Sequence, residues 1–543
     1  MLSEKFGVRN WAIAPLLLAV IAGLWLTSHI RLTSDEPSYL YVATYQDVPQ
    51  IIAPDVQPAG IPGFLEGRVL HLLFIKAVMA AGGGGEDGFQ LLGFAHLALV
   101  LLNLLLIGKI VRALLPEVAA RSAATLLLAM TPIILYLPFK TLADNEALLA
   151  ALVTTYGLVR VARGDSAAWT AAAAAGLAVA ALTKNQMVFL PAAFWLAMCL
   201  APIAGIDRRR LIVFGILGGV ASFLLTLAIL ETLGIELATY LASYRHPFSN
   251  LTPLIAKIMN LGTELGLLWI LVPVALLSRR RRELAALGAW FLISMAPFLF
   301  FSGVEPRHLA VNLAAASGLF ALALEVIGER AGAWRRLPDI GKSVVAVLGV
   351  GVLMASNAFM LAIMPHKVDL GMMREMLQTL DERYGTGRYV LLTSNGYTDF
   401  HLMRVLWPDR DVRDVSTSAM TVNTDHGSRD ELLHEYLGDH HFTGVPQLAA
   451  MDRPLVFVGF EQTFAAANLR MMLDRVSTGL GDRLIGGVDL VGHLYTPYTQ
   501  WLWQDPGVRL DPVAQAGHYR AFEVSVAGGV GLDPLEAGLN PGN

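Results

Sequence analysis

The stretch GFQLLGFAHLALVLLNLLLI, residues 88–107, is an apolar run about as long as an α-helix needs to cross a bilayer. Similar runs recur along the chain, which is 55% hydrophobic and 15% charged, with a mean hydropathy of +0.55. A soluble globular protein is about a quarter charged. The composition therefore predicts a polytopic α-helical membrane protein rather than a soluble protein with a large core.

We predict about eleven membrane spans from the apolar runs, which start near residues 11, 88, 119, 145, 167, 186, 211, 259, 284, 308 and 342. Positive charge is expected to collect in the cytoplasmic turns between spans. It does collect in alternate turns here, at Lys109, Arg112 and Arg121, at Arg160 and Arg163, at Arg208 to Arg210, at Arg279 to Arg282, and at Arg330, Arg335, Arg336 and Lys342. The pattern predicts a multi-pass protein of the inner (cytoplasmic) membrane, with its N-terminus inside and its C-terminus outside.

Residues 64–81 are apolar enough to be taken for a further span, but they contain Glu66, Arg68, His71 and Lys76. If this segment crossed the membrane, every later basic turn would fall outside. We therefore predict an interfacial helix within a long first outer loop, residues 31–87. The predicted membrane domain, residues 1–365, contains this loop.

The composition changes after His366, where charged residues and histidines become frequent. Short β-type runs at 389–393 and 454–459, with a helical stretch at 372–384, predict an α/β domain over residues 366–543. By the count of spans this domain lies outside, and its Gly- and Pro-rich end from about Ala527 is expected to be loose. Cys199 stands alone, so no intramolecular disulfide and no multi-cysteine metal site can form. The net charge of −4 gives no sign of nucleic-acid binding.

Acidic, basic and amide groups gather in the predicted outer turns. Asp35 and Glu36 stand in RLTSDEPSYL, residues 31–40, just past the first apolar run, where two adjacent carboxylates are costly to desolvate. The later outer turns contribute Asp144 and Glu146, then Lys184, then Arg245 and His246, and finally Arg307 and His308. Carboxylates could activate an acceptor hydroxyl, and the cations could hold phosphate charge. The set therefore suits a phosphorylated, lipid-linked substrate.

Each of these residues also has a structural interpretation. Lys184 could extend to the membrane interface, as long cationic side chains commonly do. Asp144 could cap the helix that starts there. Asp35 and Glu36 could open a solvated loop, Arg307 and His308 could anchor the outer face, and Arg245 and His246 could belong to an ordinary loop.

The order of these motifs resembles that of the GT-C glycosyltransferases that use polyprenyl-phosphate sugars. The motifs are Asp35-Glu36 after the first helix, Asp144-Asn145-Glu146 after the third, Lys184 closing the fifth, and Pro306-Arg307-His308 opening the tenth. The most similar group comprises protein O-mannosyltransferases, lipid A aminoarabinose transferases and rhizobial galacturonosyltransferases. The resemblance covers residues 10–330, and a C-terminal outer domain is typical in placement for such enzymes.

Three positions depart from that group. The interfacial helix begins with Ile61-Pro-Gly-Phe64 instead of a His-Pro-Pro type of start, and Gly88-Phe-Gln90 lacks the arginine often found before the second span. The last motif is Arg307-His308, where the group usually has Arg-Tyr. These departures argue against a protein mannosyltransferase.

The resemblance implies a polyprenyl-phosphate sugar as donor and a lipid, glycan or protein as acceptor. It implies Asp35 as the catalytic base, with inversion at the anomeric carbon, and Glu36 as a group that orients the acceptor. Lys184, Arg307 and His308 would bind the donor phosphate, with Asp144, Glu146, Arg245 and His246 in support. A divalent cation held by Asp35, Asp144 and Glu146 remains open, because the basic residues could do the same electrostatic work.

Other classes remain open as alternatives. A transporter of lipid-linked sugars is expected to have paired halves with broken helices and charges at mid-membrane, whereas the charges here gather at helix ends. A surface-polysaccharide polymerase or ligase shares the donor but carries its chemistry in a large late outer loop. A non-catalytic assembly protein would use its outer domain to bind partners.

Overall fold

The computed structural model describes residues 31–32, 35–45, 68–137, 142–242, 264–299, 306–330, 352–353, 368–393, 399–415, 440–442, 444–460, 502, 504–517 and 519–527. The chain divides into two compact units. One, the helical unit, contains Met1–Trp25, Gly63–His71 and Gly93–Met364. The other, the sheet unit, contains Leu26–Pro62, Leu72–Leu92 and Pro365–Asn543. Residues from the start of the chain therefore cluster with residues from its end.

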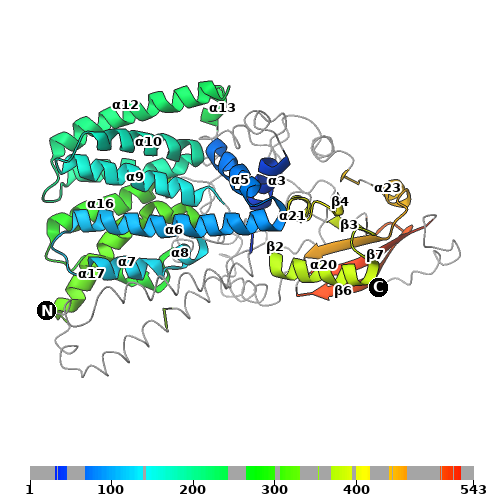
Figure 1. Cartoon of the computed structure of the whole chain (residues 1–543). Helices are drawn as coiled ribbons and strands as arrows, with labels where there is room; N and C mark the ends of the chain where they lie inside the picture. Colours follow the sequence, from blue (N-terminus) through cyan, green and yellow to red (C-terminus); the bar gives the residue numbers. More distant parts are fainter. Residues whose placement is uncertain are drawn as a thin grey trace. The chain divides into compact units, whose positions relative to one another are not determined.

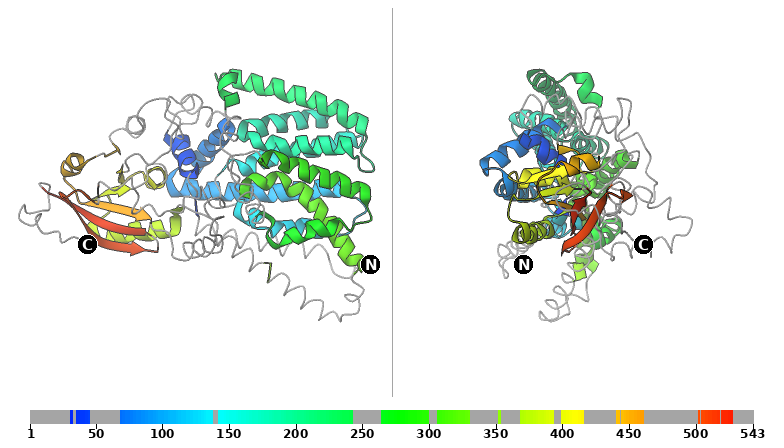
Figure 2. Two further views of the ribbon diagram at one scale, coloured as in Figure 1. Left: turned by 180° about the vertical axis from the view of Figure 1, so that it is seen from behind. Right: turned by 90° about the vertical axis from the view of Figure 1, so that its right-hand side faces the viewer.

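The helical unit consists of apolar helices packed side by side (Figure 1). Its helices include α9 (Asp144–Ala162), α10 (Ala168–Thr183) and α12 (Arg208–Thr232), which are neighbours in both views of Figure 2. The alanine-rich α10 lies very close to α9, because a methyl group at Gly176 would stand 2.7 Å from the carbonyl oxygen of Ala150. Small residues of this kind let membrane helices approach closely.

A second pair of helices is fixed by aromatic packing. In α11 (Phe189–Leu200) the ring of Phe194 lies edge-on to Trp290 of α16 (Arg281–Met295), with ring centroids 5.0 Å apart. The indole N–H of Trp290 also donates to the carbonyl oxygen of Leu190 at 3.1 Å. A buried indole usually finds such a partner, so the contact sets the register between the two helices.

Within the described part of the chain, three helical stretches are long and apolar enough to cross a membrane: α6 (Gly85–Leu114), α12, and His308–Arg330, which ends in α17 (Leu313–Arg330). Together with the fold, they support a membrane protein. Shorter apolar helices cover Val69–Ala81, Ala168–Thr183, Asn185–Leu200 and Gly266–Ala275, so the count of about eleven spans is not confirmed. The runs predicted from residues 11, 259 and 342 begin outside the described residues.

The run predicted from residue 119 is broken in the structure. It forms two short helices, α7 (Arg121–Ala129) and α8 (Pro132–Tyr136), with a turn at Met130 and Thr131. Pro132 is the cause, since proline lacks the N–H needed inside a helix but is tolerated in its first turn.

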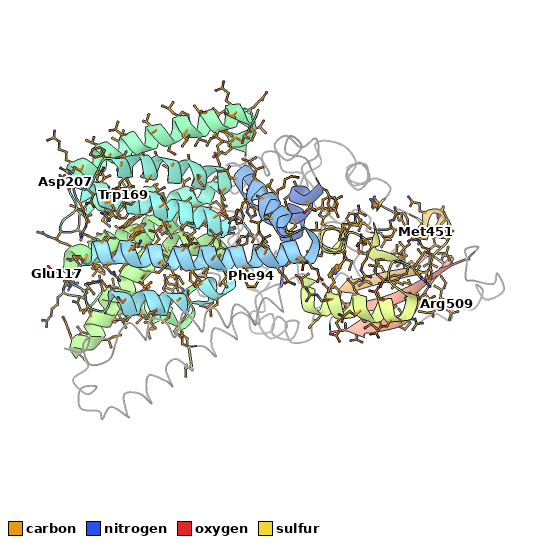
Figure 3. All side chains as sticks on the ribbon, in the orientation of Figure 1. Phe94, Glu117, Trp169, Asp207, Met451 and Arg509 are labelled. Carbon is orange, nitrogen blue, oxygen red and sulfur yellow. The ribbon has the colours of Figure 1, made fainter. Side chains whose placement is uncertain are left out.

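One end of the helical unit gathers arginines. Figure 3 labels Glu117, Trp169 and Asp207 at this end. Asp207 caps α12 by accepting hydrogen bonds from the backbone N–H groups of Arg209 and Arg210. We call this end of the helical unit, which contains Arg209 and Arg210, the arginine end.

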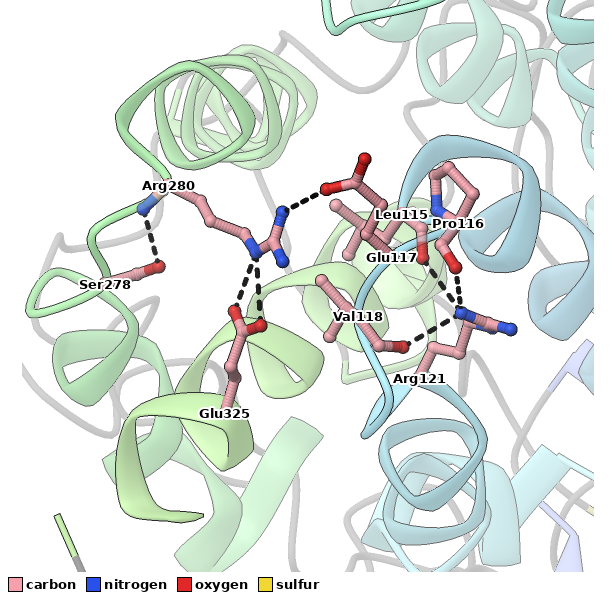
Figure 4. Close-up of polar contacts among 8 residues, drawn as sticks. All are labelled: Leu115, Pro116, Glu117, Val118, Arg121, Ser278, Arg280 and Glu325. Carbon is pink, nitrogen blue, oxygen red and sulfur yellow. Dashed lines mark hydrogen bonds and ion pairs between the residues drawn. The ribbon is translucent and has the colours of Figure 1, made fainter. Parts of the chain in front are cut away.

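Arg280 connects three segments at the arginine end. Its Nε donates to both carboxylate oxygens of Glu325 in α17, at 2.9 and 3.2 Å, and its Nη1 donates to Glu117 at 3.1 Å (Figure 4). Arg121 donates in addition to the carbonyl oxygens of Leu115, Pro116 and Val118, which holds the turn between α6 and α7. The helices at this end are therefore linked by side-chain bonds as well as by chain connections.

The sheet unit contains a five-stranded mixed sheet in the order β4-β3-β5-β7-β6. Strands β3 (Val390–Thr393), β4 (Asp411–Asp414) and β5 (Leu455–Phe460) are parallel, and β6 (Val508–Ala516) and β7 (Tyr519–Val526) are antiparallel. Every residue of β3 is buried, as expected for a strand covered on both faces. The two predicted strands and the helix before them, α20 (Leu370–Tyr384), are confirmed.

Beside α20, Asp381 forms a polar contact with the sheet. Its carboxylate accepts hydrogen bonds from both nitrogens of the Arg410 guanidinium, at 2.7 and 2.6 Å, and from the Tyr389 hydroxyl at 2.9 Å. Burial alone would raise the pKa of Asp381, but the hydrogen bonds from Arg410 and Tyr389 bring it below the ordinary value. Burial raises the pKa of Tyr389. Asp381 is thus held as the anion and Tyr389 as the neutral phenol.

The segment after the first apolar run belongs to the sheet unit. Strand β1 (Arg31–Leu32) pairs antiparallel with β2 (Val368–Asp369). The next helix, α3 (Asp35–Tyr45), packs on α21 (Asp399–Leu406), where the Tyr41 ring stacks on His401 with centroids 4.3 Å apart. The predicted first outer loop is therefore partly ordered as helix.

A glycine-rich turn joins α5 (Val69–Ala81) to α6 within the sheet unit. Gly83, Gly84 and Gly85 have φ angles of 83°, 76° and 55°, a region that other residues rarely adopt. A methyl group at Gly88 would stand 2.7 Å from the carbonyl oxygen of Met79. The turn therefore requires glycine both for its backbone angles and for the close approach of the two helices.

Candidate functional site

A buried ion pair joins two predicted site residues in the helical unit. Lys184 follows the last residue of α10, and Asp144 is the first residue of α9. The Lys184 Nζ lies 2.5 Å from Asp144 Oδ1, and the two side chains are only 4% and 2% exposed. A charge so deeply buried is tolerated only with a partner. Lys184 is therefore not a side chain that extends to the membrane interface.

Glu146 lies two residues after Asp144 in the first turn of α9, and it stands between two histidines. Its Oε1 accepts a hydrogen bond from His71 Nδ1 of α5 at 3.0 Å and lies 3.9 Å from His96 Nε2 of α6. Both histidines are fully buried. Three separate helices thus contribute to the surroundings of a single carboxylate.

Asn145 fixes the orientation of one of these histidines. Its Nδ2 donates to the carbonyl oxygen of Leu137 at 2.9 Å and lies 3.1 Å from His96 Nδ1. An amide nitrogen is a donor, so Nδ1 accepts and the proton of neutral His96 is on Nε2, facing Glu146. Asn103 of α6 donates in turn to the Asn145 backbone carbonyl at 3.1 Å.

We call this group the α9 cluster: Asp144, Asn145, Glu146, Lys184, His71, His96 and Asn103. One of its acceptor atoms, Glu146 Oε2, is buried and has no hydrogen-bond partner within the described part of the chain. A buried carboxylate oxygen without a donor is unfavourable. Glu146 Oε2 is therefore available to accept a hydrogen bond from a hydroxyl or another donor that enters the site.

Glu264 is a second buried acid of the helical unit. It is fully buried, and neither of its carboxylate oxygens has a partner among the described residues. Glu264 stands inside an apolar run and outside every motif, so nothing in the sequence marks it as a site residue.

The other predicted site residues are described only in part. Asp35 and Glu36 begin α3, but their side chains lie outside the described structure, as does that of Arg307 in the 3-10 helix η7 (Pro306–Asn312). His308 stacks on Phe298, with centroids 6.4 Å apart and planes inclined by 14°. Arg245 and His246 lie outside the described residues. The structure therefore brings together Asp144, Glu146 and Lys184, and the roles of the rest stay predictions.

Two of the three candidate metal ligands, Asp144 and Glu146, belong to the α9 cluster and already have partners there. Asp144 already contacts the ammonium of Lys184, and Glu146 accepts from His71. The described residues contain no group of three or more His, Cys, Asp or Glu side chains arranged to hold a metal ion. The side chain of Asp35, the third candidate ligand, is not described, so a cation at this site remains a prediction.

His71, His96 and Asn103 were not predicted as site residues. A signal for two of them is present in the sequence, because His96 and Asn103 are seven residues apart in an apolar run and so share one helix face. Polar side chains inside a membrane helix usually have a functional or structural partner. His71 carries no such signal, since its partner Glu146 is far away in the sequence.

The helical unit with its buried polar cluster, followed by a mixed sheet, has the fold of the GT-C glycosyltransferases, as predicted. Solved structures that share this fold include two of ArnT from Cupriavidus metallidurans. The apo structure matches with a TM-score of 0.53 and 17% identity, over 95% of this chain and 98% of that chain. The structure bound to undecaprenyl phosphate matches with a TM-score of 0.54 and 15% identity, over the same 95% and 98%.

No protein-family model matches the chain, and no curated protein sequence matches it. At 15–17% identity the likeness establishes the fold. The chemistry has to be argued from the residues of this chain.

Proposed function

We propose that this protein is a membrane glycosyltransferase that moves a sugar from a polyprenyl-phosphate donor to an acceptor. The observation that carries the proposal is the fold shared with a structure that holds undecaprenyl phosphate, over nearly the full length of both chains. The α9 cluster supports it through the buried ammonium of Lys184, because a desolvated cation can stabilise the charge that develops on a leaving phosphate.

In this proposal the reaction is a single displacement. The Asp35 carboxylate takes the proton of the acceptor hydroxyl, whose oxygen attacks the anomeric carbon. The bond from that carbon to the phosphate oxygen breaks, and polyprenyl phosphate leaves with the electron pair. Attack opposite to the leaving group inverts the anomeric configuration. Phosphate is a good leaving group, so the reaction needs no strong general acid.

The other site residues hold the reactants. Lys184, Arg307 and His308 neutralise the leaving phosphate, and Glu36 orients the acceptor. Asp144 keeps the Lys184 ammonium in place through the 2.5 Å contact. Glu146 is set by His71 and offers its second oxygen to a substrate hydroxyl. Arg245 and His246 support the donor from the neighbouring outer turn.

The site faces the outside of the cytoplasmic membrane in this proposal. The support is the alternation of basic turns and the geometry of α9, whose acidic first turn and Arg160 stand at opposite ends of the helix. Polyprenyl-phosphate sugars reach that face already activated, so transfer there requires no nucleotide.

The experiment is a transfer assay with the full chain in lipid nanodiscs. A panel of undecaprenyl-phosphate sugars is supplied as donors with an envelope lipid extract as acceptor, and released undecaprenyl phosphate is measured by mass spectrometry. We expect release with at least one donor, and an Asp35→Asn variant roughly 100-fold slower or worse, the usual range for loss of a general base.

Asp55→Asn is the matched control, because it removes an acid from the same predicted outer loop and should keep wild-type turnover. Release from no donor, or equal turnover by Asp35→Asn and wild type, would contradict the proposal. Loss of turnover in Asp55→Asn with retention in Asp35→Asn would move the base to the other acid.

A further inference from the structure

A pocket opens at the arginine end of the helical unit, away from the α9 cluster. It lies between the end of α11 and the start of α16, and its volume is about 330 Å³. Its lining consists of Ala201, Pro202, Arg281, Arg282 and Ala285. Two arginines in succession beside small apolar residues form a cationic rim over an apolar floor.

The arginines of this turn have different partners. Arg280 is held by Glu325 and Glu117, as Figure 4 shows. The guanidinium of Arg281 donates one hydrogen bond within the described structure, from Nη1 to the carbonyl oxygen of Leu276 at 3.3 Å. Arg282 is exposed, and its guanidinium has no partner among the residues that the structure describes. A guanidinium carries five N–H donors, so most of the donors at the rim remain available to an anion.

The acidic residue closest in sequence does not neutralise the rim. Glu283 stands two positions after Arg281, which places it about 200° around the helix and on the other side from the pocket. The rim is therefore cationic, with its apolar floor continuing along α16.

An exposed apolar face leads away from the rim along α16, and we call it the α16 face. Arg281, Ala285, Gly288 and Leu292 follow one another at intervals of four, three and four residues, so they lie on one face of the helix. A methyl group at Gly288 would meet nothing within 4 Å, and Leu292 is 68% exposed. On the facing helix α11, Leu200 next to the pocket is 66% exposed. The space beside Gly288 is thus open and apolar.

We propose that this pocket binds an anionic phospholipid of the surrounding bilayer. The phosphate would be held by Arg281 and Arg282, since guanidinium groups bind phosphate oxygens in pairs. An acyl chain would lie on the α16 face, from Ala285 past Gly288. A small phosphate could use only the rim, whereas a phospholipid uses the rim and the α16 face together, and basic pockets between membrane helices bind anionic headgroups in this way.

The test uses purified full-length protein and native mass spectrometry with dioleoyl phosphatidylglycerol and dioleoyl phosphatidylcholine as probes. We expect the wild type to retain phosphatidylglycerol in preference to phosphatidylcholine. Arg281→Gln and Arg282→Gln should each lower that retention by roughly fivefold, the equivalent of about 1 kcal/mol per arginine near a membrane surface. Gly288→Leu should lower retention too, with no change of charge, because its side chain takes the open space beside Gly288 where the acyl chain would lie.

Arg208→Gln with Arg209→Gln is the matched control, since it removes two exposed arginines from the start of α12. Equal loss in this control would mean a diffuse basic surface and would overturn the proposal. So would retention of both lipids alike by the wild type, displacement of phosphatidylglycerol by an equal amount of undecaprenyl phosphate, or displacement by glycerol phosphate alone. If the arginine variants fail to fold, Gly288→Leu decides, and unchanged retention there contradicts the proposal.

Discussion

The two ends of α9 carry the same kinds of residue in opposite environments. At its start, Asp144 and Glu146 are enclosed by Lys184 and His71. Near its end, Arg160 pairs with Asp165, with side chains 35% and 39% exposed, and its guanidinium lies over the rings of Trp169 and Tyr156. One helix therefore places a desolvated charge cluster at one end and a solvated pair at the other.

The difference shows how charge should be interpreted in a membrane protein. An exposed pair contributes about 0–1 kcal/mol because water and salt screen it. Removing one partner of a buried pair costs about 3–5 kcal/mol, since the remaining charge is left without water or a counter-ion. The exposed pair of Arg160 and Asp165 can be explained by orientation in the membrane alone. Burying the charges of the α9 cluster costs free energy, and orientation of the protein in the membrane does not explain that cost. The burial therefore favours a role of the cluster in substrate binding.

The largest expected effect is at Lys184. Lys184→Ala leaves the Asp144 carboxylate alone in its buried position and should lower the stability of the folded protein by about 3–5 kcal/mol. Arg160→Ala, on the same α9–α10 hairpin, should lower stability far less, because water and salt screen its pair with Asp165. Both are measured as melting temperatures of the full chain in detergent, by fluorescence-detected size exclusion.

A double variant separates stability from function at this pair. Lys184→Met with Asp144→Leu removes both charges and should fold about as well as the wild type, because an apolar pair can replace a buried ion pair. It should nevertheless fail to release undecaprenyl phosphate. Normal transfer by the double variant would show that the pair is structural and would remove the contrast between the two ends of α9.

The next effect concerns Glu146 and His71. Glu146→Gln preserves the shape and can still accept from His71, so stability should change little. Turnover should fall roughly 10- to 100-fold, which corresponds to the 1.5–3 kcal/mol of a hydrogen bond to a charged group. The measurement is the transfer assay, with kcat and KM determined separately.

His71 provides the matched pair for that experiment. His71→Leu removes the donor to Glu146 and should lower turnover as Glu146→Gln does. His71→Asn keeps a donor close to the position of Nδ1 and should restore most of the activity. Equal loss in both histidine variants would mean that the ring supports packing rather than the orientation of Glu146.

The smallest effect is expected at Arg280. It is 27% exposed and its partner Glu325 is 22% exposed, so the contact lies between the two extremes of α9. Arg280→Ala should lower stability by about 1 kcal/mol, and the difference from the wild type should shrink in 1 M salt, where charges are screened. Transfer should be unchanged. A loss as large as that of Lys184→Ala would show that exposure does not separate the two ends.

Part of the site could be predicted from the sequence, for a physical reason. Asp144, Glu146 and Lys184 stand at the ends of apolar runs, where hydropathy alone marks them as unusual. The contact between Glu146 and His71 could not be predicted, because residues 72–145 separate them and only the packed fold brings them together. His71 also stands among charged residues, which favoured an interfacial position, whereas the structure shows it fully buried.

The fold shows the same division. The strands at Val390–Thr393 and Leu455–Phe460 follow from short β-branched and aromatic runs, and both are confirmed. The break at Pro132 could have been expected from proline chemistry, but the apolar run around it concealed two short helices. The pairing of Arg31–Leu32 with Val368–Asp369 joins two-residue strands more than 300 residues apart, and no local pattern marks it.

The glycine turn between α5 and α6 affects how mutational tolerance in this protein should be interpreted. Gly83 to Gly85 require positive φ angles, and Gly88 has no room for a side chain. In a saturation screen scored by growth alone, these glycines would tolerate substitution as poorly as the residues of the α9 cluster. They nevertheless contribute no side chain to any substrate. Protein abundance must therefore be scored beside growth, because only positions that keep abundance and lose growth identify the site.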